Sequence, residues 1–164
     1  MLHSKNSRGK ESKGFTLIEL LIVITIIAIL ASVILVAVDP AKRFAQARNA
    51  QRWSEVRSIL EATLKYMVDN DGSYPSSIDS VAGTSQVLGT AAISCDGTCG
   101  AATTVSACAD LSASLVDTYL SAIPLDPKTG TSAMTDYYIN KTASGRVTVG
   151  ACDPELSATI SVTR

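Results

Sequence analysis

Cysteine thiols are the first groups in this sequence that could do chemistry. The four cysteines are Cys95, Cys99, Cys108 and Cys152, all in the C-terminal half of the 164 residues. Four thiolates can hold zinc, but the only histidine is His3, and the spacing is unlike the paired Cys-x-x-Cys pattern of zinc sites. All four cysteines follow a long apolar run, Phe15 to Val38, and would lie outside the membrane. An even number of cysteines in such a place instead favours two disulfides.

Four cysteines allow three connectivities, and the spacing favours one of them. Cys95 and Cys99 enclose Asp-Gly-Thr, which contains a turn signal and can close a small loop. We therefore predict a Cys95–Cys99 bond and, by difference, a Cys108–Cys152 bond between the middle and the end of the chain.

No constellation of catalytic residues follows residue 14. That part of the chain has no histidine, and its many serines form neither Gly-x-Ser-x-Gly nor Ser-x-x-Lys. The sequence therefore predicts no enzyme and no catalytic residue.

A single carboxylate, Glu19, interrupts the apolar run from Phe15 to Val38. As a helix those 24 residues would be about 36 Å long, enough to cross a hydrocarbon core of about 30 Å. A carboxylate at membrane depth costs at least about 2.5 kcal/mol and usually has a partner. Glu19 is either a tolerated residue near the membrane edge or a functional one.

The residues before the run favour the functional interpretation. Residues 1–14 hold four basic residues and one acid and end in Gly14. In an ordinary secretory signal the small residue follows the apolar region, whereas here it precedes it. The string Gly-Phe-Thr-Leu-Ile-Glu-Leu from Gly14 to Leu20 resembles the class III signal of type IV prepilins and pseudopilins. The resemblance implies cleavage between Gly14 and Phe15 by a prepilin peptidase, methylation of Phe15, and Glu19 as the fifth residue of the mature chain.

Cleavage would free an ammonium group at Phe15, close to the carboxylate of Glu19. Opposite charges attract strongly where little water screens them. In packed helices the amine of one chain can satisfy the glutamate of another, and a buried pair of this kind specifies register.

Charge and periodicity divide the chain into a leader, 1–14, a membrane or filament-core helix, 15–38, an amphipathic helix, 39–68, and a head, 69–164. The basic leader predicts a cytoplasmic N-terminus and an exported head. Asp39-Pro40 marks a kink or a new helix start, and Asp69 to Pro75 carries stop signals. The predicted apolar stripe of the amphipathic helix comprises Phe44, Trp53, Val56, Leu60, Leu64 and Met67.

The segment after the helix, 76–104, is rich in Ser, Thr, Ala and Gly. This composition predicts a surface loop with little regular structure. Asp110 is a predicted cap for a short helix over 111–121. Three short strands are predicted over 136–140, 146–151 and 158–162. The fold class is therefore α+β: a long N-terminal helix packed on a small head with an antiparallel β-meander.

Two further segments resemble the same family. Gly72-Ser73-Tyr74-Pro75 is similar to the segment that closes the long helix in major pseudopilins and in many pilins. Pro124-Leu125-Asp126-Pro127 is similar to an element that precedes the sheet in the same family. Some major pseudopilins bind calcium in C-terminal loops, for which Asp126, Asp136 and Asp153 could supply oxygens. Scattered surface aspartates need no metal, however, and no cofactor is predicted.

The resemblance implies a structural subunit of a type IV pilus, used for adhesion, twitching or DNA uptake. The alternative is a pseudopilin of a type II secretion system. The implied partners are further copies of the chain, the prepilin peptidase and methyltransferase, the inner-membrane assembly platform and the membrane. The precursor would be a single-pass inner-membrane protein, and the mature subunit would reach the cell surface.

Charge beyond the membrane bears on other partners. Basic residues gather between Asp39 and Lys65, whereas acids predominate from Tyr66 onward. The basic neck either pairs with acidic heads of other subunits or is a solvated helix face near anionic headgroups. The acidic head argues against a broad phosphate-binding surface, so no specific nucleic acid is predicted. The neck comprises Lys42, Arg43, Arg48, Arg52, Arg57 and Lys65.

Overall fold

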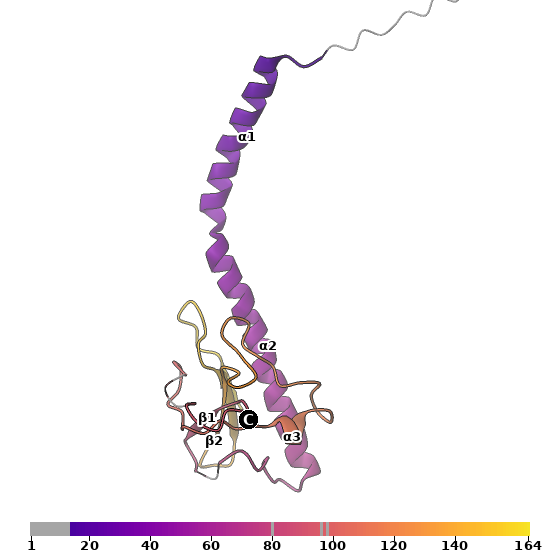
Figure 1. Cartoon of the computed structure of the whole chain (residues 1–164), viewed down its shortest axis with the longest axis vertical. Helices are drawn as coiled ribbons and strands as arrows, with labels where there is room; N and C mark the ends of the chain where they lie inside the picture. The colour runs from indigo at the N-terminus through magenta and orange to yellow at the C-terminus, as the bar shows by residue number, and fades with distance from the viewer. Residues whose placement is uncertain (1–13, 80, 96, 98) are drawn as a thin grey trace, which may run out of the picture. The chain divides into compact units, whose positions relative to one another are not determined.

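The computed structural model describes residues 14–79, 81–95, 97 and 99–164, so the leader up to residue 13 lies outside the described residues. The chain divides into two compact units, Met1–Pro40 and Ala41–Arg164. Two long helices come first, and a small antiparallel sheet follows with a short helix between its first two strands, which confirms the predicted α+β class (Figure 1).

The first unit contains the helix α1, Leu17–Val38. Leu, Ile, Val and Ala dominate it, and none of its 22 residues is buried. Among the described residues this is the one helix whose length and apolar composition suit a membrane crossing. Its surface would be unfavourable in water, so α1 fits a membrane-anchored precursor.

Helix α1 ends at Asp39, which adopts a left-handed conformation with φ 42°. The helix α2, Pro40–Asp69, begins at the next residue. Proline suits the first position of a helix because its missing N–H would have no intrahelical partner there. Of the two alternatives predicted at Asp39-Pro40, a kink or a new helix start, the structure has the new helix start.

One face of α2 builds the core of the second unit, and it differs from the predicted stripe. Val56 and Leu60 are buried as expected, but Phe44 is 65% exposed. The buried line instead passes through Ala45 and Arg52, whose side chain is completely buried. The buried residues of α2 are Ala45, Asn49, Arg52, Val56, Ile59, Leu60, Ala62 and Thr63.

The sheet has four antiparallel strands in the order β1-β2-β3-β4. The central hairpin joins β2, Tyr137–Lys141, to β3, Val147–Ala151, with Ile139 opposite Val149. The last strand, β4 (Ser161–Thr163), is shorter than predicted and lies beside β3. Three of the four strands therefore lie close to their predicted places.

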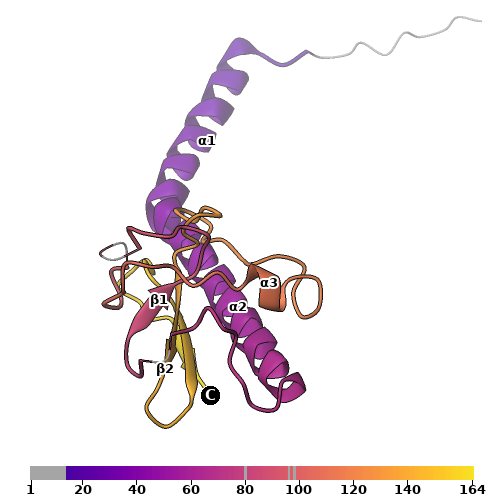
Figure 2. The same ribbon diagram turned by 60° about the horizontal axis from the view of Figure 1, so that its bottom comes forward.

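Both faces of the sheet are covered. Tyr137, Ile139 and Val149 share the main core with Val56 and Ile59 of α2, and both views show α2 beside the sheet (Figures 1 and 2). Side chains alternate between faces along a strand. The opposite face therefore presents a second cluster, which contains Val87, Tyr138, Cys95, Cys99 and Cys152.

The expectation of an irregular surface loop over 76–104 was wrong in part. This stretch contains β1, Ser85–Val87, which pairs with β2 and is buried at all three residues. Isolated parallel bridges join Ser85 to Thr104 and Leu88 to Ala109. The polar sequence Ser-Gln-Val gives little strand signal, because its burial depends on the loop that folds over it.

The predicted helix over 111–121 is also shorter in the structure. Helix α3 covers only Ser112–Leu115, and Val116 already has an extended conformation. Asp117 is left-handed with φ 69°, and its N–H donates to the carbonyl of Leu120. A non-glycine residue in that conformation cannot continue an α-helix, so a turn replaces the predicted helix end.

Candidate processing and assembly site

The segment between the leader and α1 is open. Gly14 and Phe15 precede the first helical residue, and Phe15 is 87% exposed. A Cβ atom built on Gly14 would meet no atom within 4 Å. Packing within the described residues therefore does not require a glycine at position 14.

Thr16 and Glu19 form a reciprocal capping box at the start of α1. The Thr16 backbone N–H and its hydroxyl each donate to Glu19 Oε2 at 2.8 Å. In return, the Glu19 N–H donates to Thr16 Oγ1 at 3.3 Å. The carboxylate therefore lies against the peptide group that joins Phe15 to Thr16, and it satisfies backbone donors that the helix leaves free.

Sequence reasoning singled out Glu19 but missed Thr16. The signal was present, because Thr-Leu-Ile-Glu is the Ser/Thr-x-x-Glu/Gln pattern of a capping box. The cap fixes where the carboxylate points, toward the end of the helix that the peptidase would free.

One residue of the predicted basic neck, Arg52, forms a buried ion pair in the head. Arg52 Nε lies 2.5 Å from Asp126 Oδ2, and a second guanidinium nitrogen donates to Asp126 Oδ1 at 2.9 Å. Both side chains are completely buried. The pair joins α2 to the loop before β2. For Arg52, neither alternative given for the basic neck, pairing with another subunit or a solvated helix face, is therefore correct.

Glu155 extends this network to the loop after β3. Arg48 donates to both its carboxylate oxygens, at 2.6 and 2.7 Å, and Arg52 adds a contact of 3.1 Å. The Asn49 amide also exchanges hydrogen bonds with the backbone of Glu155, at 2.7 and 3.0 Å. Charge-assisted bidentate pairs are the strongest hydrogen bonds of proteins, so this network fixes two loops onto α2.

Hydrogen bonds shift the pKa values of this network. The hydrogen bonds from Arg48 lower the pKa of Glu155 well below its usual range, against the opposing effect of burial. Burial alone would raise the pKa of Asp126, but the hydrogen bonds from Arg52 and from the N–H of Lys128 lower it. Both carboxylates are therefore charged at neutral pH.

The aspartates proposed as calcium ligands have different surroundings. Asp126 is held by Arg52, whereas burial raises the pKa of Asp136. Within the described residues no group of three or more His, Cys, Asp or Glu side chains is arranged to hold a metal. That the chain binds no cofactor stays an untested prediction.

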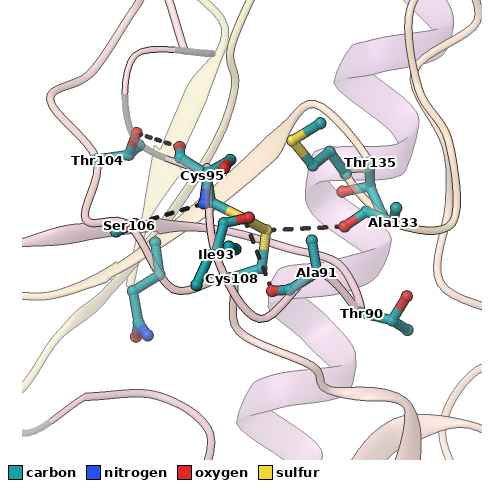
Figure 3. Close-up of a disulfide and its surroundings, with 12 residues drawn as sticks. Thr90, Ala91, Ile93, Cys95, Thr104, Ser106, Cys108, Ala133 and Thr135 are labelled. Carbon is teal, nitrogen blue, oxygen red and sulfur yellow. Dashed lines mark hydrogen bonds between the residues drawn. A yellow bond between two sulfur atoms is a disulfide. The ribbon is translucent and has the colours of Figure 1, made fainter.

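The four cysteines form two disulfides, but the predicted pairing was wrong. Cys95 is bonded to Cys108, and Cys99 to Cys152. The Cys95 N–H donates to the carbonyl of Ser106, and the Thr104 hydroxyl donates to the carbonyl of Cys95 (Figure 3). These contacts bring Cys95 to the 104–108 segment rather than to Cys99.

The second disulfide follows from a similar long-range contact. The Ala101 N–H donates to the Cys152 carbonyl at 2.9 Å, which sets Cys99 against the end of β3. The two bonds hold the 88–109 loop over the face of the sheet that α2 leaves open.

Comparison with known proteins identifies the N-terminal segment. No curated protein and no solved structure matches the chain. Residues 9–35 match the family model for the prokaryotic N-terminal methylation motif. That match spans Gly14, Phe15, Thr16 and Glu19, so the chain carries the class III signal peptide of type IV pilins and pseudopilins.

Proposed function

We propose that the chain is the structural subunit of a type IV pilus, made as a membrane-anchored prepilin. The observation that carries this proposal is the methylation motif at the head of an apolar helix with no buried residue. A helix of this kind needs either lipid or other apolar helices around it. A filament core of packed helices supplies that cover once the subunit leaves the membrane.

Processing follows from the open segment before the helix. The motif implies a prepilin peptidase, which would cut the exposed bond between Gly14 and Phe15. Because a Cβ atom at position 14 would meet no atom within 4 Å among the described residues, the small size of Gly14 would serve the peptidase rather than the fold. The same enzyme would then methylate the new amine of Phe15.

Glu19 has its role after that cut. Its carboxylate accepts two hydrogen bonds from Thr16, and the freed ammonium of Phe15 would lie one residue away. In a bundle of packed helices, the ammonium of one subunit would pair with the Glu19 of another. A pair of this kind, buried away from water, would set the axial register of the subunits.

In this function the subunit occupies two locations in turn. The precursor is anchored in the inner membrane, with its basic leader in the cytoplasm. The assembly platform then extracts the processed subunit into a homopolymer that reaches the cell surface. The networked, disulfide-bonded head would form the outer surface of that filament.

A type II secretion pseudopilin is the second candidate. The resemblance of Gly72-Ser73-Tyr74-Pro75 and Pro124-Leu125-Asp126-Pro127 to pseudopilin segments favours it. In this structure the Tyr74 hydroxyl donates to the carbonyl of Gly145, and Asp126 binds Arg52. Both segments therefore brace the head, which either kind of filament needs.

Electron microscopy of sheared cell-surface filaments, with intact-mass analysis of their subunit, tests the proposal. Long filaments whose subunit begins at a methylated Phe15 are the expected result. A mature chain found only in the membrane fraction would favour the pseudopilin. A chain that keeps its leader in both fractions would overturn both candidates.

A further inference from the structure

Phe44 is an aromatic side chain without a place in the core of its own chain. It is 65% exposed in the first turns of α2, and its neighbour Arg43 is exposed as well. The other aromatic side chains of Ala41–Arg164 are all partly or fully buried. They are Trp53, Tyr66, Tyr74, Tyr119, Tyr137 and Tyr138.

The position of Phe44 explains why it needs a second environment. It follows the apolar helix α1 by six residues, a distance at which a membrane interface would cover an aromatic ring in the precursor. Extraction into a filament removes that cover. An exposed aromatic ring beside a cation is then a typical anchor for a protein contact.

The same unit, Ala41–Arg164, carries an apolar pocket of about 360 Å³. Its lining residues come from 89–90, 109–116, 122–125 and 132–135, so α2 does not contribute to it. Asp110 is its one charged lining residue, and the Asp110 carboxylate already accepts the N–H of Ser112 at 2.9 Å. The apolar lining includes Leu111, Val116, Ala122, Ile123 and Leu125.

We propose that Phe44 of one subunit inserts into this pocket of a neighbouring copy, with Arg43 beside Asp110. An apolar cavity of about 150 Å³ is enough to bind benzene, so the pocket has room for a phenyl ring and part of a helix turn. The charges of the two surfaces are complementary, because Arg43 beside Phe44 is a cation and Asp110 is the one charged residue that lines the pocket. This inference rests on the proposed filament function.

The contact has the symmetry that a filament requires. Phe44 and the pocket lie at different places on one chain, so their contact is heterologous: every copy inserts its Phe44 into one neighbour and receives the Phe44 of another. Repeated contacts of that kind form an open helical assembly where the rotation between copies does not close into a ring, which is the case in a filament. The pocket would therefore join neighbouring heads, independently of the register set by Glu19.

Site-specific photocrosslinking tests the contact in intact filaments. p-Benzoylphenylalanine would replace Phe44, and the same group in place of Val68, an exposed apolar residue at the other end of α2, is the matched control. The expected product is a dimer in which residue 44 is joined to the 109–125 segment of another copy, absent from the control. Filaments whose residue 44 joins only lipid or other segments would overturn the contact while leaving the filament function intact. Absence of filaments from the unmodified chain would instead defeat the proposed function, and this contact with it.

Charge reversal and pocket filling give a second, independent test. Phe44→Ala, Arg43→Glu and Ala122→Trp should each lower filament yield about tenfold at equal amounts of mature protein, whereas Val68→Ala should not. Ala122 is exposed, so the added ring fills the pocket without entering the core. Asp110→Lys should restore the yield of Arg43→Glu filaments. Normal yield from Phe44→Ala and Ala122→Trp, or no rescue by Asp110→Lys, would refute the contact.

Discussion

At the residue scale, the observed helix cap of Glu19 can be separated from its proposed role in assembly, because the first needs an acceptor oxygen and the second a charge. The cap is local and needs only an oxygen that accepts the hydrogen bonds from Thr16. The proposed pairing with a neighbouring Phe15 amine needs the negative charge itself. Glutamine can perform the first role but not the second, so substitutions at this position distinguish them.

Glu19→Val should be inserted and cleaved normally yet assemble poorly as the only subunit. The freed ammonium of Phe15 would be buried without a counter-ion, which costs about 3–5 kcal/mol for a pair broken from one side. Glu19→Gln keeps the capping pattern and should fail likewise, whereas Glu19→Asp should be milder. The measurement is sheared-filament yield at equal levels of mature protein. Normal yield from Glu19→Gln would leave Glu19 as a helix cap only.

Gly14→Glu should leave an uncut precursor in the membrane. The side chain at position 14 meets no atom of the described chain, so the change affects access to the bond rather than folding. Gly9→Glu, which places the same charge elsewhere in the leader, is the matched control and should be cut. Intact-mass spectra of both variants give the answer. A Gly14→Glu chain that begins at Phe15 would contradict the assigned role of Gly14.

Site residues were predictable where they lie close together in the sequence, and were missed where their partners are far away in it. Gly14, Phe15 and Glu19 lie within one short motif, so their relation is visible in the sequence. Arg52 was grouped with a basic neck, either solvated or paired with another subunit, because its partner in the same chain, Asp126, is 74 residues away. A buried arginine on an amphipathic helix is recognised only when the loop that neutralises it is in place.

At the scale of elements, predictability follows periodicity and length. The 30-residue helix α2 and the β2–β3 hairpin have strong patterns, and both lie where they were predicted. The three-residue strand β1 and the four-residue helix α3 have too few residues for a pattern. Their boundaries are set by partners, namely β2 for one and the turn at Asp117 for the other.

The helix α2 holds the loop before β2 through the buried pair of Arg52 and Asp126. Arg52→Met should lower the free energy of unfolding by about 3–5 kcal/mol, because the Asp126 carboxylate would stay buried without its cation. The double variant Arg52→Met, Asp126→Leu should recover much of that loss. Urea unfolding of the detergent-solubilised chain, followed by the fluorescence of Trp53, measures both, with exposed Arg43→Met as control. A neutral Arg52→Met change would show that the pair adds nothing to stability.

The loops held by Arg48 and Arg52 should loosen in acid. The pKa values of Asp126 and Glu155 are lowered in the folded state, so the unfolded chain binds more protons near pH 4. Their contribution is therefore complete above about pH 5 and is lost as the pH falls through about 4 toward the folded-state values. Burial raises the pKa of Asp136, which offsets part of this loss.

Urea midpoints at pH 6 and pH 3 measure this effect. Glu155→Gln should reduce the difference between the two midpoints, whereas the exposed control Asp71→Asn should not. An unchanged difference in Glu155→Gln would mean that other carboxylates govern acid sensitivity.

At the scale of the whole molecule, the chain divides into Met1–Pro40 and Ala41–Arg164. The proposed processing and register roles belong to residues of the first unit, and the second unit is a head braced by ion pairs and disulfides. The head has two apolar clusters, one under α2 and one under the disulfide-bonded loop. Cysteine pairing was unpredictable from spacing, because it depends on which strands bring the loop and β3 together.

The two disulfides should contribute unequally to the stability of the head. The Cys99–Cys152 bond spans 53 residues and the Cys95–Cys108 bond 13. Loop-closure entropy predicts losses of about 4 and about 3 kcal/mol, respectively, when each pair is replaced by alanine. Both pairs lie against the same cluster beneath the loop, so the packing lost with each is similar in kind. Paired Cys→Ala substitution also avoids a free thiol that could exchange with the remaining bond.

Urea unfolding of the oxidised, detergent-solubilised chain would measure both losses through Trp53 fluorescence. The reduced wild-type chain provides the lower reference, since it lacks both bonds. The expected order of stability is wild type, then Cys95→Ala with Cys108→Ala, then Cys99→Ala with Cys152→Ala, then the reduced chain. Non-reducing peptide mapping of each variant confirms that the remaining pair is bonded. If the pair with the shorter loop proved the more stabilising, the loop over the sheet would be held by local packing rather than by the long-range link to β3.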